Sequence, residues 1–159
     1  MRPLLVLSFA IPALVAAAPA SSGLLLSERV AGSESVSLQR GRGYAVIAKR
    51  GAVIGNVGRG WVRVAHLPDG PSPEGYVRGC EARSGRLAEK LYCRGRALRL
   101  YVHGGTWRIR MRGRAINVSG VVRGSLGLDR DSCSLCHYRI GPADPRRWPA
   151  TLTFFTVRS

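Results

Sequence analysis

The chain has 159 residues, enough for one domain with a real core, and it carries a formal net charge of +16. Its basic residues are 23 arginines and two lysines, and none of its nine acidic residues lies between Leu91 and Leu128. This charge argues against basic partners and favours acidic polymers or acidic proteins. The codon bias of a genome of high GC content would also produce many arginines and few lysines without any binding role, so both explanations stay open.

The N-terminal residues 1–20 have the pattern of a signal peptide. Arg2 supplies the positive charge, an apolar stretch follows from Leu4 to Ala17, and Ala18-Pro19-Ala20 fits the small-residue cleavage rule. The apolar stretch is short for a membrane span and contains Pro12, so an uncleaved anchor is the weaker alternative. We therefore expect a secreted or envelope protein with no membrane span once the signal is removed.

The remaining chain predicts a flexible lead-in over residues 21–42 and a single β domain over residues 43–159. The lead-in is rich in Ser and Gly, with one edge strand expected near Val36. In the domain, short apolar runs are separated by Gly and Pro, which is typical of an all-β protein. Residues 66–75 contain three prolines and predict a surface loop, and residues 82–92 offer at most one helical turn.

The clearest local signal is a hairpin over residues 98–112. Apolar and polar residues alternate on both sides of Gly104-Gly105, which suits a two-residue turn. The apolar side chains expected on the inner face are Leu98, Leu100, Val102, Trp107, Ile109 and Met111. The outer face would then carry the candidate anion-binding residues Arg99, Arg108, Arg110 and Arg112. We expect this face to bind an anionic cell-envelope polymer or an acidic protein, and we expect no nucleic acid because the chain has an export signal and no recognisable nucleic-acid-binding fold.

An internal similarity relates two stretches that lie far apart in the chain. Arg50–Val64 aligns with Arg114–Leu128, and each contains an Arg-Gly pair before its last apolar run. Glycine at that place predicts a bulge or a tight corner. The similarity favours an antiparallel β-sandwich or small barrel built from two related strand units.

The segment His103–Asp129, HGGTWRIRMRGRAINVSGVVRGSLGLD, resembles a segment of small secreted β-rich proteins of actinobacteria that have no assigned function. The resemblance extends over roughly Tyr44 to Val157 and includes Trp148-Pro149 near the end. It implies an all-β domain and no particular activity. The cysteines that follow this segment here are a departure from that pattern.

Four cysteines in an exported chain normally pair. Cys80 and Cys93 bracket a loop of about 14 residues and flank extended segments, so we expect a disulfide between them. Cys133 and Cys136 would then either pair locally or stay free for another role.

The sequence Cys133-Ser134-Leu135-Cys136-His137 also matches the attachment motif of a c-type haem. Two thiols would hold the haem and His137 would bind the iron, with Met111, His66 or His103 as the second axial ligand. In c-type cytochromes this motif begins a helix, whereas here the flanking residues favour turns and strands. A structural disulfide is therefore favoured over covalent haem, and a redox disulfide or a metal site remains as a further alternative.

The chain shows no arrangement of residues typical of catalysis. Its three histidines fall in a strand end, a hairpin rim and the cysteine loop, with nothing in the sequence to bring them together. We therefore expect a non-enzymatic protein without a cofactor or bound metal, and an electron carrier with haem c as the alternative.

Overall fold

The computed structural model describes residues 34–158, and within this range the chain forms strands, turns and loops but no helix. The expected signal peptide and the first part of the lead-in lie outside the described residues. The strands are β1 (Glu34–His66), β2 (Glu74–Ser84), β3 (Lys90–His103), β4 (Trp107–Arg130), β5 (His137–Ile140), β6 (Arg146–Arg147) and β7 (Thr153–Val157). Because no helix is present in this range, none could cross a membrane there.

Two of the sequence boundaries differ from the structure. β1 begins at Glu34, so the end of the expected lead-in already belongs to the sheet. The segment expected to hold one helical turn instead completes β2, turns, and starts β3. In that turn the N–H of Glu89 donates to the carbonyl of Arg86 at 3.2 Å, and Gly85 has a φ of 77°. The loop predicted for residues 66–75 is confirmed over residues 67–73, between the end of β1 and the start of β2.

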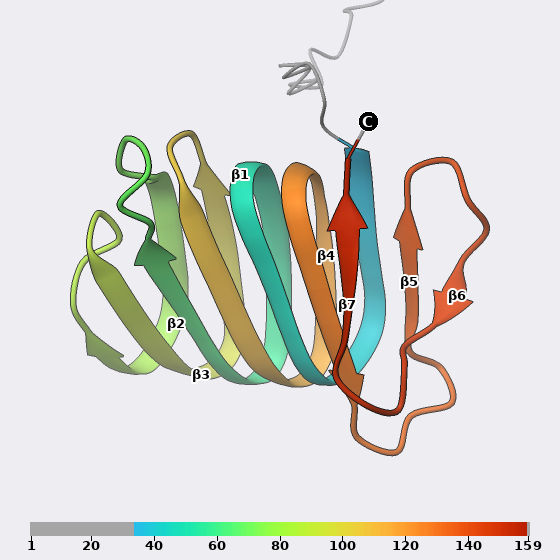
Figure 1. The fold of residues 1–159 in the computed structure, drawn as a ribbon. Helices are drawn as coiled ribbons and strands as arrows, with labels where there is room; N and C mark the ends of the chain where they lie inside the picture. The colour runs from blue at the N-terminus through green and yellow to red at the C-terminus, as the bar shows by residue number, and fades with distance from the viewer. Residues whose placement is uncertain (1–33, 159) are drawn as a thin grey trace, which may run out of the picture.

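The strands are so long that the sheet folds over on itself. The order is β2-β3-β1-β4-β7, with β5 on β1 and β6 on β5, and neighbouring strands are antiparallel. Each long strand runs along one layer, bends, and returns along the other (Figure 1). The result is a flattened coil of two β layers whose sheet is not closed, which confirms the predicted all-β antiparallel class.

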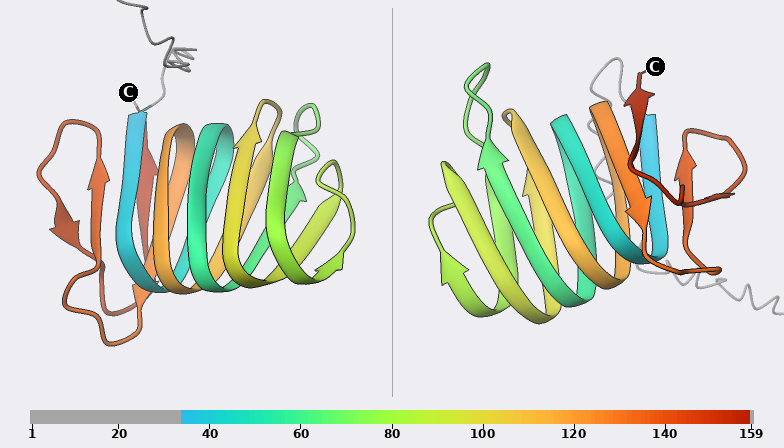
Figure 2. Two further views of the ribbon diagram at one scale, coloured as in Figure 1. Left: turned by 180° about the vertical axis from the view of Figure 1, so that it is seen from behind. Right: turned by 60° about the horizontal axis from the view of Figure 1, so that its bottom comes forward.

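Successive turns of the coil place β4 between two parts of β1. Arg112 of β4 pairs with Tyr44 on one side and with Trp61 on the other, so both of its neighbours belong to the same strand. The view from behind shows this alternation of β1 and β4 (Figure 2). The front layer of Figure 1 contains residues 43–49, 60–66, 90–95, 107–113 and 124–128, and the back layer contains residues 34–38, 52–57, 98–103, 116–121 and 137–140.

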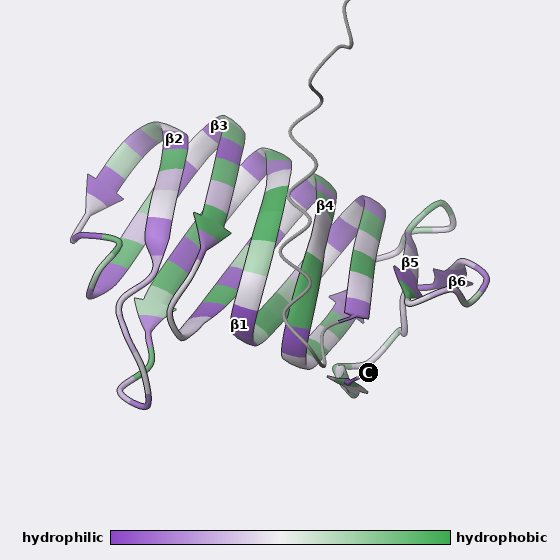
Figure 3. Ribbon diagram, turned by 90° about the horizontal axis from the view of Figure 1, so that it is seen from above, coloured by the Kyte–Doolittle hydropathy of each residue, from purple (hydrophilic) through white to green (hydrophobic). Residues whose placement is uncertain are grey.

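The core lies between these two layers. Polar and apolar residues alternate along most of each strand, so the strands appear banded when coloured by hydropathy (Figure 3). The alternation expected from the sequence is confirmed, since six predicted inner residues are at most 1% exposed: Leu98, Leu100, Val102, Trp107, Ile109 and Met111. At the end of the coil beyond β4, Tyr138 of the back layer packs against Phe155 of the front layer, with ring centroids 4.9 Å apart.

The predicted hairpin pairing is wrong, although its inner face is right. β3 and β4 are not neighbours, because β1 lies between them. Val102 pairs with Val53, and Trp107 pairs with His66. Gly104 and Gly105 have φ values of 62° and 56°, as a tight turn requires, but they carry the chain from the back layer to the front layer. The Gly-Gly motif predicts where the chain turns, but it does not predict which strands pair with each other.

The two similar stretches found in the sequence are neighbours within the one sheet and not separate halves. Ala52 pairs with Val121 and Gly55 with Val118, so the stretches run antiparallel side by side. A second, shorter similarity lies within β1 and does correspond to successive turns of the coil. Gly41–Ala48 (GRGYAVIA) and Gly58–Ala65 (GRGWVRVA) occupy the same position in successive turns of this strand.

A glycine ladder marks the bend of the coil. Across adjacent strand segments the register pairs Gly95 with Gly60, Gly60 with Gly113, and Gly113 with Gly43. A Cβ added at any of the four would lie 2.1–2.3 Å from a backbone carbonyl oxygen of another strand. The strands therefore approach too closely here for a side chain, and only glycine permits the fold.

Three residues near the glycine ladder have left-handed backbone conformations that contribute to the bend. Arg40, Ala97 and Ala115 have φ values near 50°, a conformation that costs about 1–3 kcal/mol outside glycine. The side-chain Oδ1 of Asn117 accepts a hydrogen bond from the N–H of Arg40 at 2.9 Å. Asn117 thereby stabilises the first bend of β1.

Both disulfides allowed by the sequence are present. Cys80–Cys93 joins β2 to β3, and Cys133–Cys136 closes the loop between β4 and β5. This confirms the predicted pairing of Cys80 with Cys93 and the local pairing of the other two. Two disulfides fit an extracytoplasmic compartment.

The two disulfides should differ in their contribution to stability. The entropy model assigns about 3 kcal/mol to the Cys80–Cys93 bridge and about 2 kcal/mol to the shorter Cys133–Cys136 loop. We expect C80A/C93A to lower the free energy of unfolding in urea more than C133A/C136A does. An equal or reversed order would contradict the entropic explanation.

Candidate anion-binding face

Three of the four predicted arginines lie together. Arg108, Arg110 and Arg112 alternate along β4 with the buried Ile109 and Met111. Because successive side chains of a strand point to opposite faces, the arginines project from the outer side of the front layer. Arg108 and Arg112 are exposed and Arg110 is half-buried.

Neighbouring strands extend this row into a larger basic surface. Arg63 of β1 pairs directly with Arg110, and on β3 Lys90 and Arg94 pair with Ala65 and Trp61 of β1. We call these six residues of the front layer the basic face: Arg63, Lys90, Arg94, Arg108, Arg110 and Arg112. At the adjoining bend Arg59 pairs with both Arg96 and Arg114, which continues the positive charge around the edge.

The structure separates Arg99 from the other three predicted residues. Arg99 projects from the back layer, where it pairs with Arg78 of β2 and Asn56 of β1. The sequence pattern placed it correctly on the outside of its own strand segment. The expected single face is wrong, because Leu98–His103 follows the bend and belongs to the opposite layer from Trp107–Gly113.

Aromatic rings alternate with the cations of the basic face. Tyr44, Trp61 and Tyr92 form a row in which adjacent ring centroids are 6.3 Å apart. The guanidinium carbon of Arg63 lies 6.0 Å from the centroid of Trp61 and 5.6 Å from that of Tyr92. These cation–π contacts hold Arg63 in place without a carboxylate. Its Nε is buried and has no hydrogen-bond partner within the described residues.

Carboxylates neutralise little of this face. Among residues 34–158 the ion pairs are Lys49–Asp69 at 3.5 Å, Arg96–Glu81 at 3.8 Å and Arg112–Asp131 at 3.6 Å. Only the last includes a residue of the basic face. The other five cations of the face therefore have no acidic partner in the described part of the chain.

The basic face contains two shallow hollows on either side of Arg108. One has a volume of about 230 Å³ and is lined by Arg63, Ala65, Lys90, Arg108 and Arg110. The other, of about 420 Å³, lies toward the β1–β2 loop and includes Lys49, Asp69 and Ser125. The cross-strand row runs Ser125, Ala48, Arg108, Ala65, Lys90. The small side chains on both sides of Arg108 leave room beside the long basic ones.

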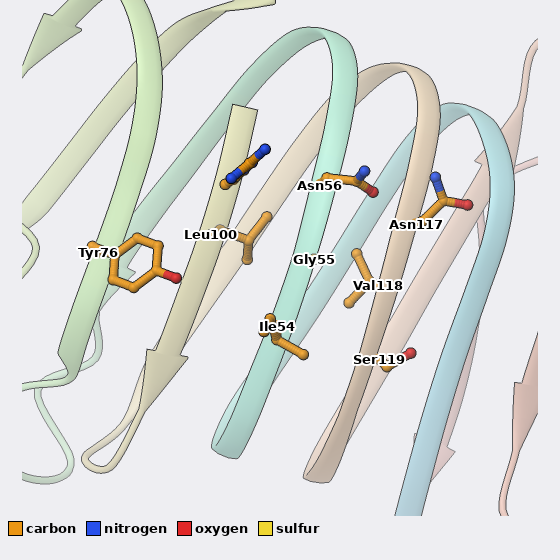
Figure 4. A pocket seen from close by; sticks show the side chains of 9 residues that line it. Ile54, Gly55, Asn56, Tyr76, Leu100, Asn117, Val118 and Ser119 are labelled. Carbon is orange, nitrogen blue, oxygen red and sulfur yellow. The ribbon is translucent and has the colours of Figure 1, made fainter. Parts of the chain in front are cut away.

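A larger hollow of about 470 Å³ lies on the back layer, around Tyr76, Ile54, Asn56 and Asn117 (Figure 4). Ile54 is 56% exposed and Tyr76 is 39% exposed. The amide of Asn117 already bonds to backbone groups at the bend, since Nδ2 also donates to the carbonyl of Ala115 at 3.2 Å. Arg99 is the only cation that lines this hollow in the described part of the chain, so its charge is lower and less continuous than that of the basic face.

The geometry does not assemble the ligands of a haem. The sulfur atoms of Cys133 and Cys136 are bonded to each other, and Cys136 is fully buried. Met111 faces the core. His66 and His103 lie at the ends of β1 and β3, away from the first bend of β1, where the N–H of Arg42 donates to Cys136 Sγ at 3.1 Å. The described residues thus place none of these three candidates beside His137.

Sequence reasoning missed half of the basic face. Arg63, Lys90 and Arg94 lie on strand segments that the sequence analysis did not bring beside Arg108–Arg112. The similarity of Gly41–Ala48 to Gly58–Ala65 was a usable signal, because it indicates two successive turns that need a common neighbour. Identifying β4 as that neighbour required the structure.

Comparison with family models, with curated proteins and with solved structures finds no match for this chain. The fold and the surface themselves therefore define its class, which is an all-β coil with two disulfides and one strongly basic face.

Proposed function

We propose that the protein is an exported, non-enzymatic binding domain whose basic face holds an anionic polymer of the cell envelope. The observation that carries this proposal is the direct pairing of Arg63 with Arg110 in a surface that includes Lys90, Arg94 and Arg108. Like charges opposite each other in a sheet are unfavourable. A bound polyanion would offset that repulsion by attracting both arginines.

The rigidity of the face supports a binding role. Each arginine stands on a strand whose alternate residues are fully buried, so the spacing of the charges is fixed by the core. Such a surface loses little backbone freedom on binding, which favours affinity.

Export is part of the same proposal. Its support is the predicted signal peptide at residues 1–20, together with two disulfides that are typical of oxidising compartments. In that location the abundant anions are those of the envelope and its polymers.

Salt-dependent retention on phosphocellulose tests the proposal. We expect R108E/R110E to reduce affinity at low salt by at least about thirtyfold, since each lost contact contributes roughly 1 kcal/mol near a solvated surface. The salt dependence of binding should become weaker as well, because fewer counterions are released.

R78E/R99E is the matched control, because it changes the net charge equally on the back layer. It should retain most of the binding of the unmodified protein. If the two double variants lose retention equally, net charge rather than the basic face is responsible and the proposal fails.

A further inference from the structure

The smaller hollow of the basic face combines features that point to one kind of ligand group. Four cations line it, namely Arg63, Lys90, Arg108 and Arg110, and Ala65 forms its floor. The side chain of Ala65 is short and stands in the cross-strand row between Lys90 and Arg108. The hollow is therefore an opening between long basic side chains.

None of the four cations has an acidic partner within residues 34–158. Arg63 is instead positioned by the rings of Trp61 and Tyr92, and its Nε is buried without a hydrogen-bond partner. A buried donor without a partner is costly and calls for an explanation. An anion seated among these cations would pair with charges that have no acidic partner in the described residues.

The volume and the donor arrangement limit the anion. A cavity needs only about 10–15 Å³ in this measure to hold one water molecule, so a volume of about 230 Å³ is enough for one charged group and its nearest linkage. A planar carboxylate is satisfied by one arginine in a two-pronged arrangement. A tetrahedral oxyanion directs its oxygens several ways and can contact cations from three strands at once.

We infer that this hollow binds a tetrahedral oxyanion, a phosphate or sulfate ester carried by the polymer of the proposed function, on which this inference rests. The hollow on the other side of Arg108 is less suited, because Asp69 there pairs with Lys49. Arg108 borders both hollows, so a polymer anchored in the first would continue past it along the face.

The test uses the full exported chain and four defined probes: inorganic polyphosphate, dextran sulfate, polygalacturonate and single-stranded DNA. Affinity is measured by titration calorimetry. Tryptophan fluorescence adds a local signal, because Trp107 and Trp148 are at most 1% exposed whereas Trp61 is half-buried on the basic face. We expect polyphosphate or dextran sulfate to bind at least about tenfold more tightly than polygalacturonate, with the better of the two showing whether the preferred oxyanion is a phosphate or a sulfate.

Ala65→Leu fills the hollow without changing the net charge, and Ser125→Leu is its control in the neighbouring hollow. We expect A65L to weaken binding of the preferred probe about tenfold and S125L to leave it within about threefold. K90Q/R108Q should behave like A65L. R78Q/R99Q removes the same charge on the back layer, outside the basic face, and should have a small effect.

Three outcomes would overturn the inference. Binding by A65L as tight as that of the unmodified protein would exclude the hollow. The basic face would still stand if R108E/R110E showed its expected loss of at least about thirtyfold in affinity. A preference for polygalacturonate would exclude the tetrahedral group but leave the proposed polymer-binding function intact. No binding of any probe would overturn both. Tighter binding of DNA than of any other probe would support a phosphate ester in the hollow but would overturn an envelope polymer as its carrier.

Discussion

Replacing Gly60 by valine is expected to lower the free energy of unfolding by about 3–5 kcal/mol, enough to prevent folding of a marginally stable domain. A Cβ at this position would lie 2.1 Å from the carbonyl oxygen of Arg112 and 2.7 Å from the Cα of Gly113. Both atoms belong to backbone, which cannot rotate away as a side chain would. Gly60 also has a φ of 155°, at the edge of the range that side chains disfavour.

The effect should be specific to the glycine ladder. Gly104 has a φ of 62° but nothing within 4 Å of an added Cβ, so G104A should cost only about 1 kcal/mol, the conformational term alone. Urea unfolding followed by circular dichroism measures both variants. A loss for G60V no greater than that for G104A would mean that the strands can separate at the bend, contrary to the close packing described above.

The features that were predicted correctly from the sequence depend on residues that are close together along the chain. Alternation identified the buried side chains of residues 98–111, because the period of two holds along any strand whatever lies beside it. The pairing of Cys80 with Cys93 followed from a short loop between extended segments. The proline-rich loop after His66 was equally local.

The sequence analysis failed where distant segments meet. Gly51 and Gly55 indicated breaks between short strands, yet in the structure both lie within one 33-residue strand. Glycine permits a sharp bend as well as a chain break, and local composition does not distinguish the two. Once β1 was divided, its second turn could not be placed between β3 and β4, and Arg99 was assigned to the wrong layer.

The second large effect concerns Trp148, which ties the last part of the chain to the first bend of β1. Its Nε1 donates to the carbonyl of His137 at 2.9 Å, and its N–H donates to the carbonyl of Cys136 at 3.0 Å. Its ring covers Gly41 so closely that an added Cβ there would lie 2.4 Å from it. Trp148 is 1% exposed, and W148A should cost about 3–5 kcal/mol by loss of packing and formation of a cavity.

The location of that loss matters more than its size. Among the described strands, β5 pairs only with β1 and β6, and β6 pairs only with β5, so this edge depends on Trp148 more than the β2–β3 end does. Amide exchange in W148A should accelerate at His137–Ile140 while Leu98–Val102 stay protected. W61A, the same change on the half-buried outer face, should cost about 1 kcal/mol and leave exchange at β5 unaltered. Unchanged protection of β5 in W148A would show that the Cys133–Cys136 loop holds this edge without the tryptophan.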